Sequence, residues 1–128
     1  MSAVTSAGKE LIDFQVKNHK SLEKWNKFEA GLVTQADLKS DEIIKNIIKK
    51  RSNYGILSEE SREDFNPELD KFFCVDPLCG TVPFSNNLNT WGLTVSFFSG
   101  DSSVGAIGCP GTKEYMHCDE KNVYLNGE

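Results

Sequence analysis

The 128-residue sequence has no unbroken apolar run near the roughly 20 residues that a membrane-spanning helix requires. Its N-terminus, MSAVTSAGKELIDF, lacks a basic region followed by an apolar core, so no secretory signal is predicted. Lys and Arg are scarce relative to Asp and Glu, 14 against 19, and the net charge is -5. Because a nucleic-acid surface needs clustered Lys and Arg, we expect no nucleic-acid polymer and no membrane as partners, and a cytoplasmic location.

The four cysteines, Cys74, Cys79, Cys109 and Cys118, include no CxxC pair. With no secretory signal, we expect them to be reduced thiols. Together with His117 they offer soft ligands for zinc, but their spacing is irregular, and Cys74 and Cys118 lie within or beside apolar strand patterns. A zinc site is therefore a minor alternative.

A cysteine nucleophile is a second alternative. Gly80 and Thr81 follow Cys79 and could stabilise a thiolate through their backbone N–H groups. No CX5R phosphatase loop follows, however, and neither His19 nor His117 is placed by the sequence to act as its base. This alternative is weaker than the zinc site.

The composition predicts one globular domain, since hydrophobic residues are 38% and charged residues 26%. Apolar residues recur at helical intervals over residues 9–28 and 36–50, which predicts two helices. Asp37 precedes the second apolar stripe and by itself is interpreted as a helix cap, with Ser40 and Asp41 as alternative caps.

The second half predicts about six short strands. They fall at residues 54–57, 71–75, 91–98, 103–109, 113–118 and 123–125. The run 91–98 is apolar enough to be buried on both faces, and Pro110-Gly111 predicts a hairpin. Asn126-Gly127 is a turn signal with no partner strand after it, as though the next element had been cut off. The fold class is therefore α+β, with a helix pair packed on one face of a largely antiparallel sheet.

Acidic residues lie at the ends of apolar runs: Glu59 and Glu60 after one strand, and Asp76 after the next. If these strands are neighbours, Glu59 and Asp76 converge. Pro77 forces an extended geometry on Asp76. Leu78 then offers a free carbonyl and Gly80-Thr81 offer N–H groups that can cradle an anion. Taken singly, each acidic residue is better explained as a turn or cap residue.

Four segments together resemble the inositol monophosphatase family, which includes bisphosphate nucleotidases. They are LVTQAD (residues 32–37), ILSEES (56–61), VDPLCGTVPF (75–84) and GAIGCP (105–110). The resemblance runs from about Lys27 to the end and covers about half of a typical member. It implies that residues 1–128 form the N-terminal portion of such a domain. The fold would be the first half of an αβαβα sandwich, with a sheet face and edge left open.

The resemblance implies a phosphomonoesterase that depends on Mg²⁺. Glu59 and Asp76 would be side-chain metal ligands, and Leu78 would bind metal through its backbone carbonyl. Hard cations such as Mg²⁺ prefer oxygen ligands of this kind. Cys79 stands where the family has a metal-binding Asp, and a thiol is a poor ligand for Mg²⁺.

Carried over in the same way, Gly80 and Thr81 would bind phosphate through backbone N–H groups. Asp37 and the Thr81 hydroxyl would orient the attacking water, and Lys27 matches a commonly basic position. The family's later Trp-Asp motif does not occur in the 128 residues. We therefore expect a phosphatase acting on a small phosphorylated metabolite, either an inositol phosphate or a nucleotide bisphosphate, that is impaired in this chain. The alternative is a non-catalytic homologue that binds a phosphate or a protein, and homodimer formation is expected in either case.

Overall fold

The computed structural model describes residues 1–23, 31–61, 66 and 68–128. The elements are α1 (Ser2–Glu23), α2 (Gly31–Lys49), β1 (Gly55–Ser58), β2 (Lys71–Cys79), α3 (Thr81–Ser85), β3 (Gly92–Ser99), β4 (Ser102–Cys109), the 3-10 turn η1 (Pro110–Thr112), β5 (Glu114–Cys118) and β6 (Val123–Leu125). Lys27 and the end of the first predicted helix lie outside the described residues.

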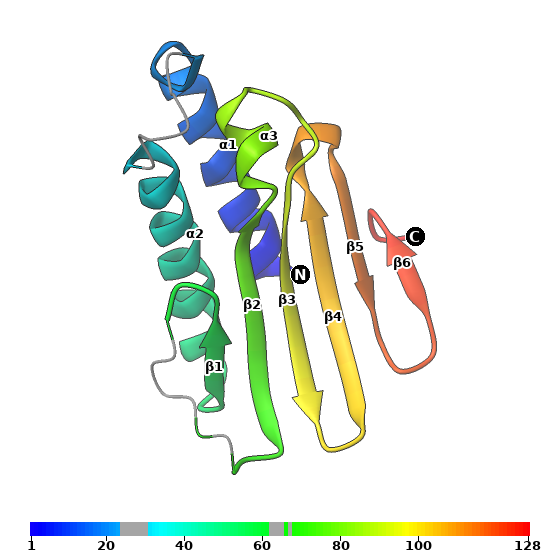
Figure 1. The fold of residues 1–128 in the computed structure, drawn as a ribbon. Coiled ribbons are helices and arrows are strands. Elements are labelled where there is room, and N and C mark those ends of the chain that lie inside the picture. The colour runs from blue at the N-terminus through cyan, green and yellow to red at the C-terminus, as the bar shows by residue number, and fades with distance from the viewer. Residues whose placement is uncertain (24–30, 62–65, 67) are drawn as a thin grey trace.

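The strands form one six-stranded sheet in sequence order, β1-β2-β3-β4-β5-β6 (Figure 1). Only β1 and β2 pair in parallel, and the other four pairings are antiparallel. The predicted largely antiparallel sheet and the hairpin at Pro110-Gly111 are therefore confirmed. Because β1 and β2 run in the same direction, their C-terminal ends meet at one edge of the sheet.

The helices α1 and α2 cover one face of this sheet (Figure 1). The buried core includes helix residues Val4, Ala7, Leu11, Ala36, Ile44 and Ile48 packed against sheet residues Ile56, Val75, Leu93 and Ala106. The core therefore lies between a helix layer and one sheet face, as α+β folds require.

The opposite sheet face, here called the open face, carries exposed apolar side chains. Ile107, Met116 and Leu125 follow one another across β4, β5 and β6, and all three are more than 40% exposed. The prediction that β3 is buried on both faces is wrong: Leu93 is fully buried on the helix side, whereas Phe98 on the open face is only partly buried. The apolar composition of β3 does not distinguish a fully covered strand from one with a half-covered face.

The helices begin earlier than the sequence predicts, at Ser2 and Gly31. Asp37, Ser40 and Asp41 are consequently interior residues of α2, so their interpretation as caps is wrong. The buried stripe continues from Ile48 and Ile44 to Ser40 and Ala36, at intervals of four residues. Small buried residues extend the stripe, and they are invisible to a count of large apolar side chains.

We predict that Gly108→Ala weakens the docking of α1 on β4. A Cβ at Gly108 would lie 2.6 Å from Val4 Cγ1 and 3.1 Å from Tyr115 Cε1, so the core would have to shift. We expect the free energy of unfolding to fall by about 1–3 kcal/mol in chemical denaturation. Gly105→Ala is the matched control on the same strand, because its Cβ would approach no atom more closely than the Ser96 hydroxyl at 3.2 Å. Equal effects of the two variants would contradict the close approach of α1.

Candidate functional site

A bulge near the end of β2 places Asp76 and Cys79 on the same side of the sheet. Asp76 pairs with Thr94 and Cys79 pairs with Gly92, so three steps on β2 oppose two on β3. Without the extra residue, side chains three positions apart would point to opposite faces. Within the bulge Pro77 is fully buried and Leu78 nearly so, and because the bulge leaves Pro77 out of the regular pairing, its missing N–H costs no ladder bond.

Glu59 reaches Asp76 because the parallel strands β1 and β2 end side by side. The Glu59 backbone N–H donates to the Val75 carbonyl at 3.2 Å, one residue before Asp76. The Leu78 N–H donates to Asp76 Oδ1 at 3.2 Å and fixes that carboxylate across Pro77. When Glu59 is protonated, its carboxyl group can donate a hydrogen bond to the Asp76 carboxylate. The structure thus brings together the two carboxylates that the sequence places at strand ends.

Repulsion between carboxylates and burial raise the pKa values of Glu59 and Asp37. The charge of Asp76 is the largest cause of the raised pKa of Glu59, followed by burial. Burial is the largest cause for Asp37, followed by the charges of Glu60, Glu59 and Asp76, and the pKa of Asp37 is raised to about 7. Asp37 therefore belongs to the same electrostatic cluster from its position on α2.

Cys79 also belongs to this cluster. Burial raises the pKa of the Cys79 thiol, and the neighbouring Asp76 raises it further, both by its charge and by a side-chain hydrogen bond. A neutral thiol therefore predominates at neutral pH. This environment disfavours the cysteine-nucleophile alternative. His117 faces the other side of the sheet, where it stacks on Tyr124 with ring centroids 4.8 Å apart.

Consecutive residues of α2 hold the ends of both strands. The buried Ser40 hydroxyl donates to the Pro77 carbonyl at 2.6 Å, inside the bulge. Asp41 accepts a hydrogen bond from Ser58, the last residue of β1, and pairs with Lys45 at 2.7 Å. Sequence reasoning missed this network. The available signal was the i,i+4 spacing of Asp41 and Lys45, which usually indicates a surface pair.

The chain turns sharply after β2 at Gly80, which precedes the short helix α3. Gly80 has φ 92° and ψ 52°, and an added Cβ would lie 3.2 Å from the Thr90 carbonyl oxygen. Glycine is favoured by both constraints. Thr81 begins α3 and is exposed. Because the first N–H groups of a helix have no intrahelical partner, this turn offers donors to an anion.

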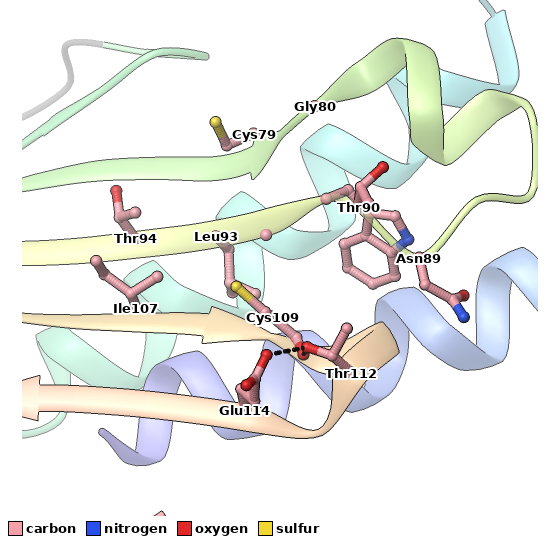
Figure 2. Close-up of a pocket in the computed structure, with 12 residues that line it drawn as sticks. Cys79, Gly80, Asn89, Thr90, Leu93, Thr94, Ile107, Cys109, Thr112 and Glu114 are labelled. Carbon is pink, nitrogen blue, oxygen red and sulfur yellow. Dashed lines mark hydrogen bonds between the residues drawn. The ribbon is translucent and has the colours of Figure 1, made fainter. Parts of the chain in front are cut away.

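Two neighbouring grooves lie on the open face and both include Thr94. The acidic groove, about 470 Å³, is lined by Glu59 and Asp76 together with Cys74, Ser96 and Phe98. The Cys79 groove, about 420 Å³, is lined by Cys79, Gly80, Ile107, Cys109 and Glu114 (Figure 2). In the second groove Thr112 donates to Glu114 at 2.6 Å, at the rim away from Cys79.

The donor types at this site fit a hard cation better than zinc. Within residues 1–23, 31–61, 66 and 68–128, no three His, Cys, Asp or Glu side chains form a ready-made metal site. That finding gives no support to zinc, which needs three or four such ligands. Mg²⁺ is commonly held by one or two carboxylates plus phosphate oxygens and water, which Glu59 and Asp76 can match. The charge of Asp76 raises the pKa of Glu59, and a cation bound between the two carboxylates would relieve this repulsion.

Comparisons with known proteins show the family of the chain. The sequence model of the inositol monophosphatase family matches residues 1–128. The chain belongs to this family. Inositol-1-monophosphatase of Rhizobium meliloti is 36% identical over 110 residues, which cover 84% of the chain and 40% of that protein. Inositol-1-monophosphatase of Synechocystis is 39% identical over 89 residues, covering 66% of the chain and 29% of that protein.

Solved structures of the family share the fold. The extragenic suppressor protein suhB of Bartonella henselae superposes with a TM-score of 0.79 at 26% identity, covering 98% of the chain and 48% of that structure. Inositol monophosphatase from Anabaena gives a TM-score of 0.79 at 22% identity, with 98% and 44% coverage. The chain thus spans about half the length of these inositol monophosphatase family structures, as the resemblance implied, and its α+β class is confirmed.

We predict that Asp37→Asn stabilises the chain in cation-free buffer and that the gain is larger at pH 8 than at pH 5. The pKa of Asp37 is raised in the fold to about 7 from its ordinary value of 3.8, so folding favours the protonated form. The stability that protonated Asp37 contributes to the fold is fully present below the pKa of this residue in the unfolded chain. It is lost as the pH rises through about 7. After discounting for solvent screening at this partly exposed position, we expect a gain of about 1 kcal/mol in chemical denaturation at pH 8.

Glu42→Gln is the matched control, since it removes the same charge from an exposed position of α2. A stabilisation by Asp37→Asn that did not change with pH, or that Glu42→Gln reproduced, would show that Asp37 does not feel the cluster.

Proposed function

We propose that the chain carries the N-terminal half of a Mg²⁺-dependent phosphomonoester hydrolase acting on a small phosphorylated metabolite. The observation that carries this proposal is the convergence of Glu59, Asp76 and Asp37 beside the glycine turn at Gly80. Repelling carboxylates next to an anion-binding turn are a combination that a divalent cation and a phosphate would neutralise together. Family membership supports the same conclusion.

Glu59 and Asp76 would hold the cation through their carboxylates, with the Leu78 carbonyl as a third oxygen donor. A bound divalent cation lowers the pKa of water and neutralises charge on phosphoryl oxygens. The chain's own contribution is geometric: regular pairing with β3 places Asp76 on the open face, the Leu78 N–H holds its carboxylate there, and the bulge at Pro77 brings Cys79 to the same face.

The backbone N–H groups of Gly80 and Thr81 would bind the phosphate. Asp37, half-buried on α2 beside this cluster, would orient the attacking water. The Thr81 hydroxyl would orient the same water. Cys109 and Glu114 line the groove beside Gly80, where the rest of the phosphate ester would have room.

The substrate class stays open between an inositol phosphate and a nucleotide bisphosphate. One structural neighbour was solved with 2'-AMP bound, but at 18% identity that likeness supports the fold alone. A homodimer, the cytoplasmic location and the absence of nucleic-acid and membrane partners stay predictions. The described helices include none that is long and apolar enough to cross a membrane.

A second candidate is a non-catalytic homologue that binds phosphate without hydrolysing it. The observation favouring it is Cys79, whose raised pKa leaves a neutral thiol where the family pattern places a metal-binding Asp. The thiol removes one negative charge and one oxygen donor from the proposed cation site. Binding by the Gly80 turn would survive this loss better than catalysis would.

We predict that the 128-residue chain releases phosphate far more slowly than a full-length family member. The substrates to compare are inositol monophosphate and adenosine 3',5'-bisphosphate, each with Mg²⁺, with phosphate release as the measurement. Asp76→Asn should abolish any residual turnover, because it removes a proposed ligand. Turnover near that of a full-length member would overturn the expected impairment, whereas residual turnover insensitive to Asp76→Asn would contradict the proposed site.

We predict that Cys79→Asp tightens Mg²⁺ binding to the chain by about tenfold, because it adds an oxygen ligand and a negative charge beside Asp76. Calorimetric titration of Mg²⁺ measures the affinity. Cys79→Ser is the matched control, because it removes the sulfur without adding charge and should leave the affinity low. Equal affinities for the two variants would remove Cys79 from the proposed set of ligand positions.

A further inference from the structure

A buried ion pair on α2 contacts the turn that carries Glu59. Asp41 is 6% exposed, and its carboxylate pairs with Lys45 Nζ at 2.7 Å. The Ser58 hydroxyl donates to Asp41 Oδ1, and Lys45 Nζ donates to the Ser61 hydroxyl. One member of the pair therefore contacts the start of the turn 58–61, and the other contacts its end.

The turn itself is closed by its own backbone. The Ser58 N–H donates to the Ser61 carbonyl at 2.9 Å, and the Glu60 N–H donates to the Ser58 hydroxyl at 3.3 Å. The link from the Glu59 N–H to Val75 then joins the turn to β2. Glu59 thus lies in a short loop that is fixed at both ends by α2 and in the middle by the neighbouring strand.

Stability alone does not account for the pair. Two buried charges lose much of their hydration, and apolar residues of similar volume often replace such a pair at no cost in stability. Apolar replacements could not donate to Ser61 or accept from Ser58, however. What the charges provide beyond an apolar contact is therefore a defined position for the two serines.

We propose that Asp41 and Lys45 are positioning residues that hold Glu59 in register with Asp76. Neither side chain needs to touch a cation or a substrate for this role. The effect on cation binding rests on the proposed function, whereas the effect on the geometry of the turn does not. Residues that orient a metal ligand commonly change metal affinity by about 10- to 100-fold when they are replaced.

The experiment compares the chain with the double variant Asp41→Val, Lys45→Met, which replaces the pair by apolar side chains. Hydrogen exchange of individual amides, measured without divalent cations, is the first readout. We expect protection of the Glu59 amide to fall about tenfold further than protection of the β3 and β4 amides, because the turn opens locally. Glu42→Gln, Lys50→Met is the control, since it removes the same charges at exposed positions.

Calorimetric titration with Mg²⁺ alone is the second readout, made in the Cys79→Asp background. We expect the double variant to bind Mg²⁺ about tenfold more weakly than its parent and the control to match the parent. If the parent binds no Mg²⁺, the proposed function fails, and the exchange measurement still decides the positioning role. Glu59 protection that falls no further than that of β3 and β4 overturns the proposal.

A variant that lowers core stability would obscure this comparison, so Ser61→Ala is the second variant. It leaves the ion pair in place and removes only the contact of Lys45 with the end of the turn. We expect a selective loss of Glu59 protection here too. Unchanged protection of Glu59 in Ser61→Ala, together with an effect of the double variant on all amides alike, assigns the pair a structural role and overturns the proposal.

Discussion

The candidate site depends on the docking of α2 against the ends of two parallel strands. Ser40 holds the bulge of β2 through the Pro77 carbonyl, and the next residue, Asp41, holds the end of β1 through Ser58. Since both anchors lie on one rigid helical turn, the two strand ends are fixed relative to each other. Asp37 lies one turn earlier on the same helix and is carried into the cluster by the same docking. A shift of α2 would move all three carboxylates apart at once.

This docking works against the electrostatics of the cluster. Burial and neighbouring carboxylates raise the pKa of Asp37, and the charge of Asp76 together with burial raises the pKa of Glu59, so the ionised chain folds against a repulsive term. The opposing contribution comes from the core between the helices and the sheet, where Leu11 of α1 and Ile44 of α2 are buried. Stability generated away from a site allows the site itself to keep an unfavourable arrangement, which is the usual relation between scaffold and function.

Much of this architecture can be predicted from the sequence, because strands and tight turns have strong local sequence patterns. The hairpin at Pro110-Gly111 follows from its turn residues, and the strand order follows from short connections. The bulge is harder to predict from the sequence, since Pro77 is compatible with either a strand end or an irregular strand. The network around Asp41 and Lys45 is the hardest feature to predict from the sequence. At i,i+4 spacing the two residues cannot be distinguished from a solvated pair until the tertiary packing is known. The roles of Glu59 and Asp76 came from resemblance, since either residue alone would be interpreted as a turn.

Cys79 connects the electrostatic and functional sides of the site. The bulge aims its side chain to the same face as Asp76, so an Asp at this position, as in the family pattern, would add a further charge to the cluster. A neutral thiol spares the cation-free chain that repulsion and at the same time takes an oxygen donor from the cation. Cys in place of Asp would therefore stabilise the cation-free fold and weaken binding at the proposed cation site. Weak catalysis and an intact fold are for that reason compatible outcomes of one substitution, and family membership alone does not imply turnover.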